Sequence, residues 1–164
     1  MTGRMQRLGW TMGLAALLTG SMAGATGNID TNNAFAWSEN AGWINLAPTN
    51  GSVTLKAAGL SGYAWAENVG WIKLAAVDST YANTTTNDWG VYLAGKALRG
   101  YAWSENAGWI NFAPSQGGGV TISNGWFAGY AWSENVGWIH LSAAPTYGVH
   151  STSPLWNATA VLFR

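Results

Sequence analysis

The segment Gly129–Ile139 reads GYAWSENVGWI, and close copies of it recur along the 164-residue chain. Each copy has a second tryptophan six residues after the first and an apolar residue at its end. The copies are 35–46 (FAWSENAGWINL), 63–74 (YAWAENVGWIKL), 101–112 (YAWSENAGWINF) and 130–141 (YAWSENVGWIHL). Repetition of this kind indicates units that cannot bury their apolar faces alone and must pack against one another.

Each copy is predicted to form a β-hairpin. Aromatic and β-branched residues with glycine at their boundaries favour short strands over helices. The turn Ser-Glu-Asn-x-Gly suits a hairpin, because serine can bond the backbone two residues on, while asparagine and glycine accept a left-handed φ. Since strand side chains alternate, the tyrosine and both tryptophans of a copy share one face, and alanine, isoleucine and leucine share the other. We expect the aliphatic face to be the core.

A further strand is predicted before three of the hairpins. Val53, Val91 and Val120 each lie twelve residues before the first tryptophan of the next hairpin, and each has a glycine nine residues after it. The units differ in length mainly at the polar loop 75–90, which we interpret as a tolerated surface insertion. The sequence therefore predicts an all-β fold built of tandem three-stranded antiparallel repeats.

The segment 147–164 is a degenerate copy without a turn. Val149 is followed seven residues later by Trp156, in the position that Leu60 has in the second unit. The first hairpin, in contrast, has no valine strand before it. The segment can cap an open array as an atypical terminal repeat, or it can supply the strand that the first hairpin lacks. Within one chain the second arrangement closes a small ring, and between chains it builds a fibre.

The segment 1–25 has the features of a secretory signal peptide. Arg4 and Arg7 precede a mostly apolar stretch, and Ala23–Ala25 reads Ala-Gly-Ala, a small-residue cleavage site. The apolar stretch is shorter than the roughly 20 residues of a membrane-spanning helix. We expect a mature chain of one domain, 26–164, with no membrane span, that is secreted to the extracellular space, the cell surface or the periplasm.

The composition argues against an enzyme. Seven basic residues balance seven acidic ones, so no basic field attracts nucleic acid, and the absence of cysteine removes disulfides, thiol nucleophiles and cysteine zinc sites. The turn glutamates occupy equivalent positions, whereas a catalytic carboxyl pair needs two different environments. We interpret them as solvated or turn-bonding and predict no catalytic residue, no metal site and no cofactor. These glutamates are Glu39, Glu67, Glu105 and Glu134.

The repeat resembles two groups of bacterial proteins. The string GYAWSENxGWINF, present at 100–112, is similar to the tandem repeat of a set of secreted bacterial proteins, and the similarity covers most of 35–141. More loosely, the Trp-turn-Trp hairpin at Trp103–Trp109 resembles the choline-binding repeats of bacterial surface proteins, in which aromatic hairpins stack into a solenoid and hold ligands between rings. The units here are longer and carry the additional valine strand, so the choline site is not carried over.

The aromatic face of the hairpins needs a cover. Each tryptophan has about 200 Å² to bury, so the eight tryptophans of the four copies amount to roughly 1,600 Å². Monomeric proteins rarely leave an apolar patch above about 300–600 Å² exposed. Neighbouring repeats, another subunit or a ligand must therefore cover most of this face.

Two functions are consistent with such a face. The leading hypothesis is a non-enzymatic extracellular structural protein, a homo-oligomer or homopolymer, that self-associates through sheet edges and Trp-rich faces into a filament or surface layer. The alternative is a lectin-like surface module that binds a carbohydrate or choline by stacking of tryptophan and tyrosine. Both use the same predicted interaction residues, namely Phe35, Trp37, Trp43, Tyr63, Trp65, Trp71, Tyr101, Trp103, Trp109, Tyr130, Trp132 and Trp138.

Overall fold

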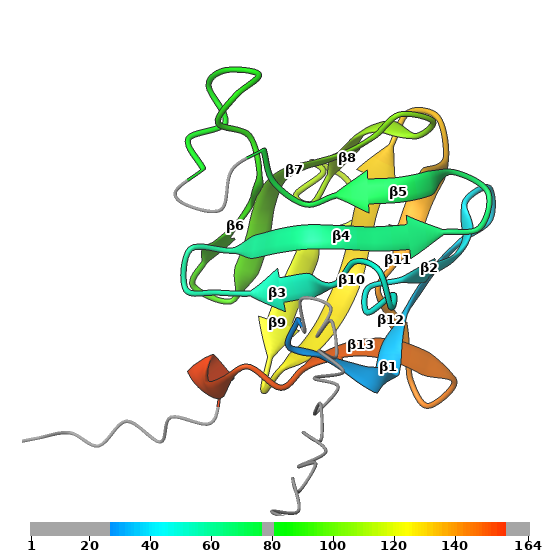
Figure 1. Ribbon diagram of the computed structural model, residues 1–164, viewed down its shortest axis with the longest axis vertical. Coiled ribbons are helices and arrows are strands. Elements are labelled where there is room, and N and C mark those ends of the chain that lie inside the picture. The colour runs from blue at the N-terminus through cyan, green and yellow to red at the C-terminus, as the bar shows by residue number, and fades with distance from the viewer. Residues whose placement is uncertain (1–26, 77–80, 157–164) are drawn as a thin grey trace, which may run out of the picture.

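The computed structural model describes residues 27–76 and 81–156, and in these ranges the fold is all-β apart from one short 3-10 helix at Pro154–Trp156 (Figure 1). The predicted all-β class is therefore confirmed. The predicted signal peptide, 1–25, and residues 157–164 of the degenerate copy lie outside the described residues. Within the described ranges, no helix has the length and apolar character needed to cross a membrane.

The four motif copies form the eight strands of a closed antiparallel barrel (Figure 1). Its strands pair in chain order, each with the next, and the last strand pairs with the first through Trp37 and His140. The predicted alternatives of an open array and a closed ring are thus resolved in favour of a closed ring. The barrel strands are β1 (Ile29–Ser38), β2 (Gly42–Asn45), β4 (Leu60–Ala66), β5 (Gly70–Lys73), β7 (Ala97–Ser104), β8 (Gly108–Asn111), β10 (Trp126–Ser133) and β11 (Gly137–His140).

Shorter strands extend the barrel at one end. β3 (Val53–Leu55), β6 (Val91–Ala94) and β9 (Val120–Ser123) pair with the first halves of β4, β7 and β10. For the first hairpin, the short strand is β13 (Tyr147–Ser151), which pairs with both β1 and β10. It follows the two-residue strand β12 (Ser142–Ala143) and also pairs with it.

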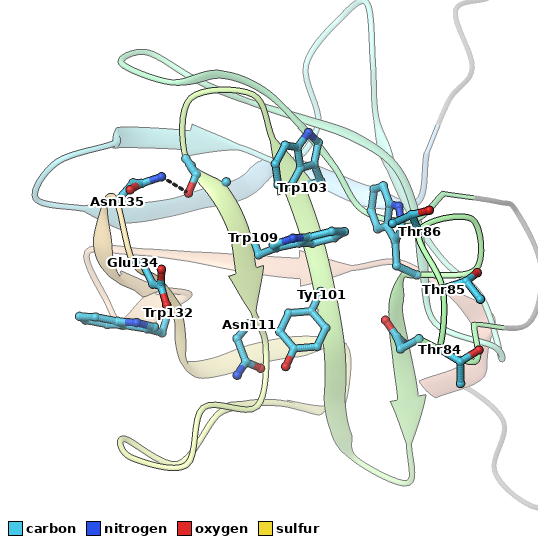
Figure 2. Close-up of a pocket in the computed structure, with 14 residues that line it drawn as sticks. Thr84, Thr85, Thr86, Tyr101, Trp103, Trp109, Asn111, Trp132, Glu134 and Asn135 are labelled. Carbon is cyan, nitrogen blue, oxygen red and sulfur yellow. Dashed lines mark hydrogen bonds between the residues drawn. The ribbon is translucent and has the colours of Figure 1, made fainter.

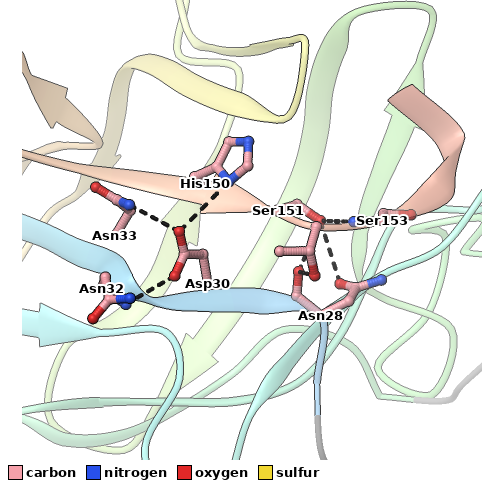
Figure 3. Close-up of polar contacts among 8 residues, drawn as sticks. Asn28, Asp30, Asn32, Asn33, His150, Ser151 and Ser153 are labelled. Carbon is pink, nitrogen blue, oxygen red and sulfur yellow. Dashed lines mark hydrogen bonds and ion pairs between the residues drawn. The ribbon is translucent and has the colours of Figure 1, made fainter. Parts of the chain in front are cut away.

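The C-terminal strand therefore pairs within its own chain. Val149 lies opposite Ala34 of the first long strand, which is the partner that the first hairpin lacks in sequence. Figure 3 shows the polar contacts that join the two segments. The Asp30 carboxylate accepts a hydrogen bond of 2.8 Å from the Asn33 amide and lies 3.8 Å from His150 Nδ1. The Ser151 hydroxyl donates to the carbonyl oxygen of Asn28 over 3.0 Å.

Every hairpin has the same register. The two tryptophans of a copy are direct cross-strand partners in all four hairpins. The glycine that ends each turn has a φ between 68° and 77°, as expected for a residue without Cβ. The turn asparagines do not use the left-handed φ that asparagine tolerates, because among the described non-glycine residues only Asn83 and Asn124 have a positive φ.

The aliphatic face of the hairpins fills the barrel, as predicted. These side chains alternate with the outward aromatic residues along each strand. They belong to one continuous hydrophobic cluster and are 5% exposed or less. The central members are Ala36, Ile44, Ala64, Ile72, Ala102, Ile110, Ala131 and Ile139.

Candidate functional site

The twelve predicted interaction residues lie together on the outside of the barrel, and we call this set the aromatic belt. Each of its side chains is between 36% and 44% exposed. These values agree with the expectation that most of the aromatic face is covered, and they leave about two-fifths of each residue accessible to solvent. The belt offers a regular series of exposed rings on a rigid backbone.

The rings of the belt are held by one another. The two tryptophans of each hairpin pack edge to face, with centroids 4.8–4.9 Å apart and interplanar angles of 63–72°. The tyrosine or phenylalanine that begins the hairpin lies 6.0–6.2 Å from the second tryptophan, again edge to face. Such contacts are favourable for aromatic pairs and fix the orientation of the exposed faces.

In each hairpin, one side of the second tryptophan is covered by a connector between hairpins. In two hairpins the covering residue is aromatic: Tyr147 lies 5.1 Å from Trp43, and Trp89 lies 5.3 Å from Trp109. In the other two it is a glycine, Gly51 on Trp71 and Gly117 on Trp138, where a Cβ would come within 2.8 Å of the indole. On their other sides, Trp71, Trp109 and Trp138 line hollows at the junctions between hairpins.

Three of these junctions are hollowed into grooves with the same lining. The groove between β8 and β10 has a volume of about 830 Å³, that between β5 and β7 about 510 Å³, and that between β11 and β1 about 370 Å³. Volumes of 300–1,000 Å³ are usual for small-molecule sites. In each groove one hairpin supplies its tyrosine, its second tryptophan and a polar residue two positions later, and the next hairpin supplies its first tryptophan, glutamate and asparagine.

The serine and asparagine of the turns build the rims of the grooves. The Ser133 hydroxyl and the Asn135 amide both donate to the carbonyl oxygen of Ala107 in the neighbouring turn, over 2.6 and 3.3 Å. Figure 2 shows the bond from Asn135. Ser104 and Asn106 make the same pair of bonds to Val69, and Ser38 and Asn40 make them to Val136. Sequence reasoning assigned these side chains to their own turns and missed the contacts between turns.

The side chains of the turn glutamates are exposed to solvent. Glu134, Glu105 and Glu39 each line one groove. In the described part of the chain, none of the three has a hydrogen-bond or ion-pair partner. Their carboxylate oxygens are thus free to accept hydrogen bonds from a bound molecule.

The polar residue after the second tryptophan differs between the grooves. In the β8/β10 groove Asn111 accepts a bond from Ala113 N–H, and its amide nitrogen has no partner among the described residues. In the β5/β7 groove Lys73 donates to the Ala76 carbonyl over 3.3 Å. In the β11/β1 groove His140 stacks on Tyr130 at 4.2 Å, and burial lowers its pKa, which favours the neutral ring.

The loop that was interpreted as a tolerated insertion forms one wall of the largest groove. Thr84, Thr85 and Thr86 line this groove on the side of Trp109 away from Trp132 and Glu134 (Figure 2). Trp89 also lines it and packs edge to face on Trp109, with ring centroids 5.3 Å apart. The Asp88 carboxylate holds this segment by accepting bonds from Thr84 and Thr85, and these bonds lower the pKa of Asp88. Sequence reasoning missed Trp89, although an aromatic residue in a polar loop two positions before Val91 was an available signal.

No metal centre accompanies the grooves: among the described residues, no three histidine, aspartate or glutamate side chains come together as ligands. Comparisons with protein-family models, with curated proteins and with solved structures found no match to this chain. Its function must be inferred from the grooves of the aromatic belt.

Proposed function

We propose that the protein is a saccharide-binding module and that the β8/β10 groove holds sugar units against Trp109. A pyranose ring with equatorial hydroxyls has flat faces of C–H bonds and a rim of hydroxyl groups. An exposed indole flanked by planar polar side chains complements both parts. The observation that carries the proposal is the combination, in one open groove, of an exposed Trp109 with a carboxylate, of Glu134, and an amide nitrogen, of Asn111, that have no hydrogen-bond partner among the described residues.

The polar groups of the groove suit hydroxyl groups. Glu134 can accept two hydrogen bonds, the Asn111 amide nitrogen can donate, and the hydroxyls of Thr84–Thr86 can do either. Polar groups of both kinds around an aromatic floor favour a polyhydroxylated ligand over a purely apolar one.

Self-association into a filament or surface layer has less support from the geometry. With two-fifths of each ring exposed, the whole belt offers roughly 1,000 Å². Because the belt encircles the barrel, only about a quarter of that area faces any one partner, whereas a stable interface buries about 800 Å² on each side. The open edge of β3 is also satisfied, since the Asn28 side chain bonds both the carbonyl and the N–H of Leu55, at 2.8 and 2.7 Å.

The proposal is tested by calorimetric titration and tryptophan emission with four soluble probes. These are β-1,4-linked glucose hexaose, β-1,4-linked N-acetylglucosamine hexaose, α-1,4-linked glucose hexaose and choline chloride. We expect saturable binding of at least one β-linked hexaose with a change in emission. Binding of choline alone would favour an aromatic cation site instead, and binding of none of the probes would contradict the proposal.

Matched variants assign the binding to the groove. A hydrogen bond to a charged group contributes about 1.5 kcal/mol, so E134Q should weaken binding at the β8/β10 groove about tenfold. E67Q changes the equivalent carboxylate of the second turn, which lines none of the three grooves, and should leave the affinity unchanged. Equal effects of E134Q and E67Q would place the ligand elsewhere.

A further inference from the structure

We infer that the chain carries this saccharide site three times, in the β8/β10, β5/β7 and β11/β1 grooves, and cross-links polysaccharide as a trivalent binder. The inference rests on the proposed function and extends it from one site to the whole barrel. It assigns a valency and a class of partner, a long polysaccharide with many identical units.

The evidence for three sites is that six lining positions recur in all three grooves, five of them with the same residue type. The second tryptophan and the preceding tyrosine supply the aromatic floor from one hairpin, and the first tryptophan, glutamate and asparagine of the next hairpin complete the wall. The sixth position is the residue two after the second tryptophan. The three sets of tyrosine, second tryptophan, sixth position, first tryptophan and glutamate are Tyr101, Trp109, Asn111, Trp132 and Glu134; Tyr63, Trp71, Lys73, Trp103 and Glu105; Tyr130, Trp138, His140, Trp37 and Glu39.

The rims of the three grooves are also equivalent. In each, a serine hydroxyl and an asparagine amide of one turn donate to a single carbonyl of the turn before it. The carbonyl-bearing residues are Ala107, Val69 and Val136, which occupy the same turn position. Because the serine and the asparagine on either side of the glutamate are fixed in this way, each of the three glutamates starts from an equivalent position in its turn.

The fourth junction, between β2 and β4, departs from this pattern at three points. Phe35 replaces the tyrosine and so removes a hydroxyl, and Ala66 replaces the rim serine. The Asn68 amide donates to the carbonyl of Asn40 over 3.1 Å, one residue away from the position used in the other turns. The repeated site is therefore assigned to three junctions and not to all four.

The closed barrel directs the sites away from one another. Going round the ring, the β5/β7 and β11/β1 junctions are separated by two hairpins in either direction, so they lie on opposite sides of the barrel. One linear saccharide cannot fill both of these grooves while it lies straight. Separate polysaccharide chains can fill them together, and linking of such chains raises the overall avidity without any new contact.

The test uses the full mature chain, a short probe and a long probe. Calorimetry with the β-linked hexaose that binds should give three sites per chain. E134Q, E105Q and E39Q should each reduce the number of sites of full affinity from three to two, because each affects one groove. Light scattering with the corresponding long β-glucan should rise on mixing with the wild type and stay at the baseline for the E105Q/E39Q double variant, which keeps one strong site.

Fold integrity is not at issue for these variants, because the three carboxylates make no contact that the substitution would remove. E67Q serves as the matched control and should retain three sites and full scattering. One site per chain, or loss of all binding through a single variant, would overturn the inference while leaving saccharide binding intact. Absence of binding by every saccharide would overturn the proposed function itself, and the inference with it.

Discussion

Three of the long strands, β4, β7 and β10, have a glycine at the residue where they change partner. Both the positive φ and the lack of room for a Cβ require glycine there. Gly62, Gly100 and Gly129 have φ values of 88°, 87° and 90°. A Cβ at each would collide with the carbonyl oxygen of the residue before the valine strand. The first long strand has Ala34 at this point, where the register shifts and Val149 is the partner. In each of the other three long strands, the glycine therefore allows the strand to pair with a short strand in its first half and with barrel strands in its second half.

Two variants separate the effect of the Cβ collision on the free energy of unfolding from the effect of the positive φ. Gly118 has a φ of 84°, and a Cβ there would meet nothing within 4 Å. G118A should lower the free energy of unfolding by about 1 kcal/mol, from backbone strain alone. G129A has the same strain and must also push apart two strands, so we expect a loss of about 3 kcal/mol or more.

Urea unfolding followed by tryptophan emission measures both values. The prediction is contradicted if the two variants lose equal stability, because the close approach of the Gly119 carbonyl would then have no energetic consequence.

At the scale of elements, much of the hairpin could be predicted from a single copy. The spacing of Trp103 and Trp109 on either side of a turn with glycine predicted a hairpin with both rings on one face, and the alternation of Ala102 and Ile110 with them predicted the core. These features depend on neighbours in sequence. The rim bonds of Asn106 depend on which hairpins become neighbours in space, and a repeat motif does not contain that information.

The closure of the barrel was left open by the sequence for the same reason. Val149 has the same spacing as the other strand valines whether it pairs with its own chain or with another. Only the pairing with Ala34 and the contacts of Asn28 with Ser151 decide between them. The grooves were likewise hidden, because each combines residues of two hairpins and, in the largest, a loop that varies between units.

We expect Asp30, where β1 pairs with β13, to make the stability of the barrel fall at low pH. The Asn33 amide, and then the Asn32 N–H, donate to Asp30 and hold its pKa below the ordinary value. The folded chain therefore favours the carboxylate, so this stabilisation is complete above about pH 4 and disappears as the pH falls through the lowered pKa. D30N should lower the melting temperature at pH 6 and flatten its decline between about pH 4 and pH 2.

A second variant identifies which contact is responsible. His150 is a smaller cause of the lowered pKa than the two asparagines. Thermal unfolding of H150Q across the same pH range should therefore retain most of the decline. If H150Q flattens the curve as much as D30N does, the ion pair and not the hydrogen bonds provides the acid sensitivity.

At the scale of the whole molecule, the barrel has no unique beginning. Its eight strands form a closed circuit, and the two ends of the described chain meet where Thr152 N–H donates to the Asn28 carbonyl over 2.8 Å. Each connector also covers the second tryptophan of the hairpin that follows, and the last connector covers that of the first hairpin through Tyr147. The two ends of the described chain thus lie side by side where β13 pairs with β1.

A circular permutant should consequently fold to the same barrel. We expect a chain that begins at Gly118, ends at Gly117 and joins residue 156 to residue 27 by a short Gly-Ser linker to keep every strand pair, because Gly118 lies in a connector with open space around it. The near-ultraviolet circular dichroism of its tryptophans should match that of the parent, since the edge-to-face pairs are preserved.

A truncation after Leu141 provides the opposite case. It removes β12 and β13, which leaves the first half of β1 without its partner and takes from the start of β10 one of its two neighbours. Unpaired strand edges of this kind recruit other chains, so the truncated protein should aggregate or form swapped oligomers on size-exclusion chromatography, while the permutant remains monomeric. A monomeric, cooperatively folding truncation would show instead that the pairing of β11 with β1 closes the barrel without help from the C-terminal strand.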